Sequence, residues 1–389
     1  MLGLLNKKSL PFAMKVICPV CHQATEFTLK GWRCNCGQAW ECFIQEEFDP
    51  YLIRTDISSL WRYHDLFGFE LPDPLVTLGG GWTPILPAQY GGRDVFFKCE
   101  YLNPSGTFKD RGMELMINLL KGLGAEQVVE DSSGNAGASL AAYAARAKIQ
   151  AEIYAPITAS PVKLSQIEIY GAKVHRIIGP RENSTTAVLQ AVENGAVYAS
   201  HAWNPAYLLG QQTTAWEVWE QLGKRAPDVW VSPVGQGGHF LGIWQGFKRL
   251  FAADLIEKLP CMIGVQSARM APICSALNQH VAQLPELDVN LASIAEGVMV
   301  SKPVRWKKII QAVEESQGMC IAVNEEDILP ARNQLARAGF FVEPTSALAV
   351  AALSKIFQNT NADKIIVVSL TGSGLKVPLT ITSRLKYDY

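Results

Sequence analysis

Four glycine-rich segments hold most of the residues in this sequence that could do chemistry. They are 103–112 (NPSGTFKDRG), 132–137 (SSGNAG), 234–238 (VGQGG) and 371–376 (TGSGLK). Lys109 stands behind Phe108 at the expected start of a helix, where the helix dipole and partial desolvation both disfavour the charged ammonium. A lysine amine that is neutral near pH 7 is what Schiff-base chemistry requires, whereas a solvated lysine in an exposed first turn would have no such role.

The second and third segments offer groups that bind anions. Ser132 and Ser133 precede a helix start whose free backbone N–H groups suit a carboxylate or phosphate, although one serine could instead cap the helix. Gly235, Gly237 and Gly238 lack side chains, so their N–H groups can approach a phosphate closely. The G-x-G-G spacing departs from the dinucleotide signature and no Walker-type motif occurs, so we expect a phosphate cradle without a dinucleotide.

The remaining polar groups of these segments suit an aromatic ring. Asn135 can donate a hydrogen bond to a phenolate-like oxygen. Thr371 and Ser373 follow an almost wholly aliphatic run, and either hydroxyl can give a neutral hydrogen bond to a ring nitrogen. A plain turn would explain the fourth segment equally well.

A cluster of cysteines near the N-terminus predicts a metal site. Cys18 and Cys21 form a C-x-x-C pair, and Cys34 and Cys36 form a C-x-C-G group further along. This spacing indicates tetrahedral ligation of zinc, which would be structural because four thiolates leave no open position. A metal-free remnant or a redox pair are the alternatives.

Composition limits the classes of function. The 389 residues are 48% hydrophobic and only 18% charged, which argues against a disordered chain or a coiled coil. The 35 basic and 36 acidic residues give a net charge of −1, so the sequence lacks the excess of positive charge expected of a protein that binds nucleic acid or an anionic membrane. An odd cysteine count and the lack of a secretory pattern in residues 1–12 favour reduced thiols and a cytoplasmic protein.

Short β-rich runs alternate with longer helical runs from about residue 94 onward. Strands are expected at 94–101, 127–129, 153–154, 174–178, 197–198, 229–231, 263–265 and 365–370, with helices at 108–123 and 135–147 among those between them. This alternation predicts an α/β fold whose mostly parallel sheets are flanked by helices. Before it, 27–29 and 31–33 are expected to form a small β ribbon around the cysteines, and 57–63 has helical features.

Taken together, the four segments resemble those of pyridoxal-phosphate enzymes of the tryptophan-synthase-β type (fold type II), and among these the threonine synthases. The resemblance covers essentially the whole chain, and residues 103–112, 132–137 and 371–376 match threonine-synthase motifs in order, with Ser373 in place of a histidine. It implies a zinc-ribbon-like module (1–48), a large cofactor-binding domain (49–101 and 216–389), a smaller mobile α/β domain (102–215) and a homodimer.

The resemblance also implies a role for each matching residue. Lys109 would form the Schiff base with pyridoxal phosphate and move protons at the substrate carbons. The remaining cofactor contacts would come from Asn135 at the ring oxygen, Thr371 or Ser373 at the pyridine nitrogen, and the phosphate ligands Gly235, Gln236, Gly237 and Gly238. The small-molecule amino-acid substrate would be held by Ser132, Ser133, Gly134, Ser105, Asn204 and Tyr207.

Three features depart from the threonine-synthase pattern. Tyr207 stands where N-P-x-R-x-x-G would place a phosphate-binding arginine, and Arg111, Arg181 or Lys163 are candidates for the missing charge. The G-Q-G-G loop and the segment 293–297 (SIAEG), with Glu296, look more like threonine and serine dehydratases. The leading expectation is therefore a lyase converting O-phosphohomoserine to threonine. The alternatives are a β-eliminating or β-replacing enzyme, such as a dehydratase or a sulfur-amino-acid synthase, or a catalytically silent binding protein.

Overall fold

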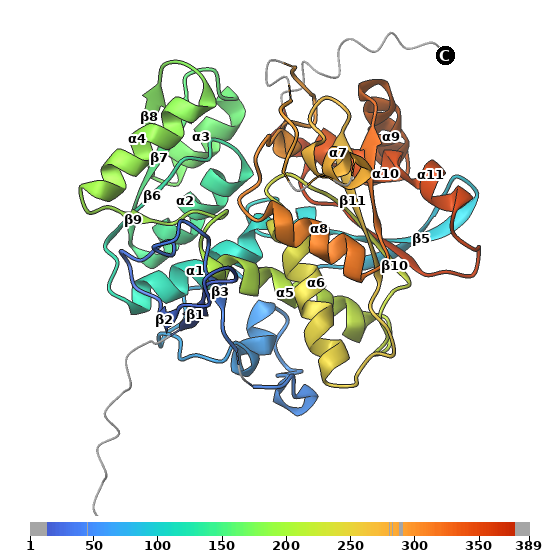
Figure 1. The fold of residues 1–389 in the computed structure, drawn as a ribbon, viewed down its shortest axis with the longest axis horizontal. Helices are drawn as coiled ribbons and strands as arrows, with labels where there is room; N and C mark the ends of the chain where they lie inside the picture. Colours follow the sequence, from blue (N-terminus) through green and yellow to red (C-terminus); the bar gives the residue numbers. More distant parts are fainter. Residues whose placement is uncertain (1–13, 45, 280, 282, 288–290, 378–389) are drawn as a thin grey trace, which may run out of the picture.

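Three β-sheets organise the chain in this computed structural model, which describes residues 14–377 except 45, 280, 282 and 288–290. The segment 1–12, considered above for a secretory signal, lies outside the described residues. Figure 1 shows the three parts side by side, with the small N-terminal sheet against the green, four-stranded part and the larger sheet beyond it.

The N-terminal module contains a three-stranded antiparallel sheet. Its order is β2-β1-β3, with strands β1 (Lys15–Ile17), β2 (Ala24–Glu26) and β3 (Glu41–Cys42). The ribbon expected at 27–29 and 31–33 is wrong, because these residues form the loop between β2 and the second cysteine pair. Phe27 of this loop is buried in the core shared with the neighbouring domain, so the loop packs there rather than pairing as a strand.

The second sheet has four parallel strands in the order β8-β7-β6-β9. Its strands are β6 (Gln127–Glu130), β7 (Gln150–Pro156), β8 (Lys173–Ile177) and β9 (Val197–Tyr198). The helices of this part are α1 (Lys109–Gly122), α2 (Asn135–Ala147), α3 (Pro161–Ile169) and α4 (Arg181–Glu193). One apolar core joins α1, α2 and α3 to β6 and β7, while Val188 of α4 packs on the other face against Val129 and Tyr198.

The third sheet has six strands in the order β12-β11-β10-β13-β5-β4, and only the edge strand β4 is antiparallel to its neighbour. Its strands are β4 (Ile85–Tyr90), β5 (Arg93–Lys98), β10 (Val229–Pro233), β11 (Cys261–Ser267), β12 (Met319–Val323) and β13 (Ile366–Ser369). Every residue of β10 and β13 is buried, and for β13 this agrees with the almost wholly aliphatic run at 365–370, which is typical of a strand covered on both faces.

Helices cover both faces of this sheet. The longer ones are α5 (Pro205–Gln221), α6 (Gly238–Ala252), α7 (Pro272–Gln279), α8 (Trp306–Glu315), α9 (Glu325–Arg337), α10 (Pro344–Ala351) and α11 (Leu353–Gln358). Short 3-10 turns are η1 (Pro50–Leu52), η2 (Leu60–Leu66), η3 (Glu100–Leu102), η4 (Glu296–Val298) and η5 (Gly374–Lys376). A tryptophan-rich core under α5, α6 and α8 fills one side, and an aliphatic core under α9, α10 and α11 fills the other.

The observed architecture confirms the predicted α/β class with helix-flanked, mostly parallel sheets. The helices predicted at 108–123 and 135–147 appear as α1 and α2. Of the segment 57–63, only residues 60–63 are helical, and they belong to the 3-10 turn η2. The domain boundaries given above remain a prediction. Within the described part of the chain, every helix is too short or too polar to traverse a bilayer.

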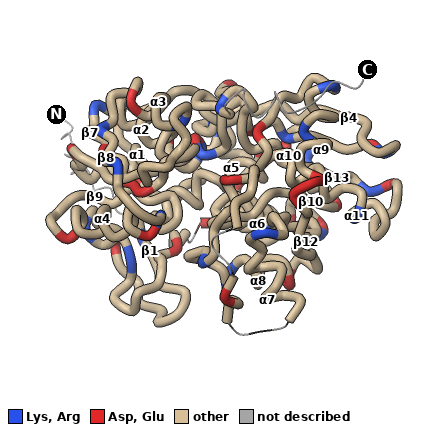
Figure 2. Tube along the Cα trace, turned by 90° about the horizontal axis from the view of Figure 1, so that it is seen from above, with Lys and Arg blue, Asp and Glu red and all other residues tan. Residues whose placement is uncertain are grey.

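Charge and cysteine chemistry add two further observations. Figure 2 shows basic and acidic residues interspersed along the trace, in keeping with the nearly neutral sequence.

Cys274 of α7 and Cys320 of β12 form a disulfide, with their Cα atoms 4.9 Å apart, which corrects the expectation of wholly reduced thiols. Because 46 residues separate the two cysteines, no local pattern indicated that α7 packs against β12.

Candidate functional site

The carboxyl ends of β5, β6, β10 and β13 lead into the four glycine-rich segments. In parallel sheets these ends lie at one edge, where ligands collect. The structure brings three of the segments and the start of α1 together around a cavity of about 350 Å³ between the second and third sheets. Segments far apart in sequence are tied directly, since the Phe108 N–H donates to the Thr371 carbonyl at 3.0 Å.

Lys109 begins α1 and lines this cavity. Burial lowers the pKa of its amine to about 8, while Glu130 and Glu343 oppose the shift and Arg181 adds to it. Its Nζ lies 4.7 Å from the centre of the Phe108 ring, and none of the described residues forms an ion pair with it. A pKa of about 8 gives this amine a far larger neutral, reactive fraction at physiological pH than an ordinary lysine has.

Lys376 provides an instructive contrast with Lys109. Burial lowers its pKa to about 8 as well. Its Nζ, however, donates to the Ser105 carbonyl at 2.7 Å, and the side chain does not line the cavity. Position and hydrogen bonding, rather than pKa alone, therefore select Lys109.

The second segment leaves its serines available. Ser132, Ser133 and Gly134 line the cavity, and the cap position of α2 is Gly134, with no side-chain capping bond. The capping interpretation of these serines is therefore wrong. Hydroxyls and backbone N–H groups at the start of α2 face the same space as Lys109, which suits a carboxylate.

Asn135 presents its amide between the two larger sheets. Its Nδ2 donates to both carboxylate oxygens of Glu343, at 3.0 and 3.1 Å. Its Oδ1 is buried and has no partner among the described residues. Nothing in the sequence patterns singled out Glu343, which precedes α10 and lines the cavity.

The third segment forms a tight backbone turn. Gly237 has a φ of +78° at the start of α6, a conformation that favours glycine. A Cβ on Gly235 would lie 2.7 Å from the Gly297 carbonyl oxygen, so the chain approaches too closely for any side chain. Gln236 accepts a hydrogen bond from Val304 N–H at 3.1 Å, which fixes the loop and leaves its backbone N–H groups to serve an anion.

Of the two hydroxyls in the fourth segment, the structure brings only Thr371 to the cavity. Thr371 is buried, and its Oγ1 lies 3.0 Å from Ser346 Oγ. Ser373 accepts a hydrogen bond from the Leu375 N–H and lies outside the cavity lining.

Three residues predicted to bind substrate lie outside the cavity lining. Ser105 donates to the Asp110 carboxylate, and Asn204 caps α5 by accepting from Ala206 N–H at 2.9 Å. The Tyr207 ring is fully buried, and Cβ atoms added to Gly112 or Gly238 would come within 3.0 Å of it. Tyr207 therefore fills space between α1 and the third segment, with no partner for its hydroxyl among the described residues.

Of the three candidates for the missing charge, Arg181 and Lys163 line the cavity. Lys163 of α3 forms an ion pair with Glu296 of η4, with 2.9 Å between Nζ and the carboxylate oxygen. Arg111 does not reach the cavity, because it is fully buried between Glu100 and Glu217.

The two histidines near the site differ in their hydrogen bonds. His239 is satisfied on both ring nitrogens, by Gln211 at 3.0 Å and Ser369 at 2.7 Å, and its burial lowers its pKa to about 3. His239 is therefore a structural histidine. His201 is bound through Nδ1 to Glu130 at 3.0 Å and also lines the cavity.

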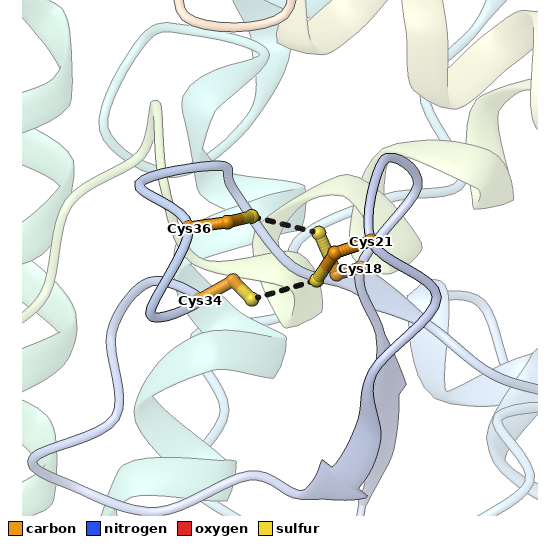
Figure 3. Close-up of side chains that lie close together, drawn as sticks. All are labelled: Cys18, Cys21, Cys34 and Cys36. Atoms are coloured by element: carbon orange, nitrogen blue, oxygen red, sulfur yellow. Dashed lines mark hydrogen bonds between the residues drawn. The ribbon is translucent and has the colours of Figure 1, made fainter.

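The cysteine cluster lies apart from this cavity. Figure 3 shows Cys18 and Cys21 on one loop facing Cys34 and Cys36 on another. Cys18 and Cys36 sulfurs are 3.4 Å apart, as are those of Cys21 and Cys34, and all four lie within 4.8 Å of one another. Thiolates bound to one zinc ion at about 2.3 Å lie about 3.8 Å apart, so the four sulfurs fit a single ion.

The module that carries these cysteines is anchored beside the site. Trp32 packs edge-on against Tyr198 and Trp203, with ring centres 5.2 and 4.9 Å away. Arg305 donates to the carbonyls of Trp40 and Trp203, both at 2.9 Å. The module thus supports the segment from which His201 reaches the cavity.

Comparisons with known proteins agree with this geometry. The model of the family described as pyridoxal-phosphate dependent enzyme matches residues 76–372. Threonine synthase from Methanocaldococcus jannaschii is 34% identical, over 89% of this chain and 89% of its own. Threonine synthase from Synechocystis is 38% identical, over 92% of this chain and 87% of its own.

Solved structures support the same fold. Maize serine racemase superposes with a TM-score of 0.67 at 23% identity, covering 78% of this chain and 90% of that one. A threonine deaminase from T.th. gives a TM-score of 0.65 at 24% identity, covering 75% of this chain and 92% of that one. At these identities the likeness concerns the fold alone.

Proposed function

The chain belongs to the pyridoxal-phosphate dependent enzymes as a threonine synthase-like lyase, and we propose that it converts O-phosphohomoserine to threonine and phosphate. The observation that carries this proposal is Lys109, a buried amine with a pKa of about 8 in a cavity that also holds an anion cradle. The cofactor, when bound, would supply an electron sink for negative charge at the substrate carbons.

The residues present fit the cofactor. The glycine-rich turn at 235–238 would hold its phosphate, and the Thr371 hydroxyl would face the pyridine nitrogen. A neutral hydroxyl does not force that nitrogen to be protonated, so charge stabilisation relies on the surrounding dipoles. Asn135 would meet the ring oxygen, since Glu343 takes up only part of its donor capacity.

The same cavity offers places for the two anionic groups of the substrate. Ser132, Ser133 and Gly134 would bind the carboxylate at the start of α2. Lys163 and Arg181 would bind the phosphate and so supply the charge that Tyr207 lacks. Lys109, whose lowered pKa makes its neutral amine accessible, would take and return protons at the substrate carbons.

The cysteine cluster, the compartment and the assembly belong to the same proposal. We propose one structural zinc ion at Cys18, Cys21, Cys34 and Cys36, supported by the sulfur distances. A cytoplasmic homodimer is proposed from the resemblance to threonine synthases. The balanced charge supports a small-molecule partner rather than nucleic acid or a membrane surface.

The test is a product analysis on the purified, cofactor-loaded protein. O-phosphohomoserine should yield phosphate and threonine in equal amounts, while threonine and serine should yield little keto acid. Rapid keto-acid formation from threonine or serine, without phosphate release from O-phosphohomoserine, would instead favour the dehydratase alternative.

A further inference from the structure

A buried carboxylate and an imidazole form a pair at the wall of the cavity. Glu130 is the last residue of β6, and His201 follows the short strand β9, which lies beside β6 in the sheet. Glu130 Oε1 lies 3.0 Å from His201 Nδ1, and Glu130 Oε2 accepts the His201 backbone N–H at 3.1 Å. Both carboxylate oxygens therefore hold the same residue.

This double contact fixes the orientation of the imidazole ring. Burial and the neighbouring Asp131 raise the pKa of Glu130, while the His201 backbone N–H and the charges of Lys109 and Arg181 favour its ionised form. When Glu130 is ionised, it favours the His201 tautomer whose proton is on Nδ1, which leaves the Nε2 lone pair free to accept. His201 is 8% exposed and lines the cavity together with Lys109 and Arg181. None of the described residues hydrogen-bonds to Nε2, in contrast to His239, whose two nitrogens are both engaged.

The electrostatic surroundings agree with a neutral imidazole. Burial lowers the pKa of His201 well below 6.5, and the neighbouring Lys109 and Arg181 lower it further. The Tyr207 ring packs edge-on against it, with ring centres 5.9 Å apart, and contributes no acceptor. A phosphate dianion arriving beside Arg181 would supply the negative charge that makes protonation of the ring favourable.

We infer that His201, oriented by Glu130, is the base that takes a proton from the water molecule added to the substrate. This role rests on the proposed function. Phosphate leaves the γ-carbon, and Lys109 returns the proton taken from Cβ to that carbon, which becomes the methyl group. The water oxygen then bonds to Cβ and its O–H bond breaks, with the proton passing to His201 Nε2. The electron pair of the Cα–Cβ double bond moves to Cα, which then receives a proton from Lys109. His201 returns its proton to the departing phosphate.

Loss of this base should divert the product rather than stop the reaction. The unsaturated amino acid formed by phosphate loss, if it is not hydrated, leaves the enzyme and hydrolyses to 2-oxobutanoate and ammonia. General base catalysis contributes about 10²-fold or more, so 2-oxobutanoate should become the main product. Phosphate release, which precedes water addition, should stay within about threefold of wild type by the same argument.

The experiment measures phosphate, threonine and 2-oxobutanoate together in cofactor-loaded His201→Gln. Glu130→Gln is the second variant, because its amide oxygen can still accept from Nδ1–H and should give a smaller diversion in the same direction. His175→Gln is the matched control, since His175 also pairs with a carboxylate, Glu152 at 2.6 Å, but lies outside the cavity lining.

The outcomes separate this role from the proposed function. A threonine-to-oxobutanoate ratio unchanged in both variants overturns the role of His201 and leaves the proposed function intact. Loss of phosphate release together with threonine in both variants also overturns it, because His201 would then act before water addition. A wild-type protein that releases no phosphate overturns the proposed function and this role with it.

Discussion

The Asn135 amide is held in one orientation by Glu343, whose two carboxylate oxygens lie 3.0 and 3.1 Å from Nδ2. The contact joins the start of α2 to the residue before α10, and so links the second sheet to the third. A carboxylate can only accept, so it fixes the amide with its nitrogen toward Glu343. The second Nδ2 proton is then available to the cofactor ring oxygen.

Removing this carboxylate should weaken cofactor binding. We expect Glu343→Ala to raise the dissociation constant of pyridoxal phosphate about tenfold, since a hydrogen bond to a charged group contributes about 1.5–3 kcal/mol. Glu343→Gln should have a smaller effect, because its amide oxygen can still accept. Equilibrium dialysis of the apoprotein measures this directly, and Glu315→Gln on the exposed face of α8 is the control. Equal affinity in the wild type and all three variants would remove the role of Glu343.

The rate of cofactor attachment should depend on the protonation of Lys109. Its pKa of about 8 lies below the usual 10.5, so the reactive neutral amine increases as pH rises from 6 to 9. We expect the rate at which the apoprotein forms its visible absorption band to rise about tenfold per pH unit below 8 and level off above it. A rate that continued to rise to pH 10 would show that burial does not lower this pKa.

The buried ion pairs of Arg111, two residues after Lys109, should be important for stability. Arg111 is fully buried and bonds two carboxylates, Glu100 at 2.7 Å and Glu217 at 2.5 Å. Arg111→Met should lower the free energy of unfolding by about 3–5 kcal/mol, since it leaves buried charge unpaired. Arg54→Met breaks an exposed pair with Asp65 and should cost about 1 kcal/mol or less. Denaturant unfolding of the two variants should show this difference, and equal losses would contradict it.

Much of this site follows from local sequence pattern. The glycine-rich segments follow strands that are recognisable from aliphatic runs, and parallel strands bring their carboxyl ends to one edge. Lys109, Asn135 and the turn at 235–238 were therefore predictable as neighbours. Thr371 could not be separated from Ser373, because only the hydrogen bonds of the folded turn decide which hydroxyl faces the cavity.

Long-range packing explains what the sequence could not predict. Glu343 meets Asn135 across a separation of 208 residues, and no local pattern encodes that contact. Tyr207 occupies the position of an expected phosphate ligand, yet the absence of side chains at Gly112 and Gly238 lets its ring pack inward. Glu130 did carry a signal, since a charged residue ending a buried strand requires a partner such as His201.

Metal removal should loosen the N-terminal module. We expect about one zinc per chain by elemental analysis, and loss of most of it in Cys21→Ser, because each thiolate holds one corner of the site. Cys261→Ser, outside the cluster, should retain the metal. Chelation should raise the exposure of Trp32, whose ring packs against Tyr198 and Trp203, as seen by fluorescence quenching. Full metal content in Cys21→Ser would contradict the assignment.

The covalent attachment of the cofactor to Lys109 is tested most directly by borohydride reduction of the loaded protein, followed by digestion and mass spectrometry. We predict that the peptide containing Lys109 gains the mass of the reduced cofactor, and that Lys109→Ala gives no such adduct. Attachment at Lys376, whose pKa is also about 8, or at Lys163 would contradict the account.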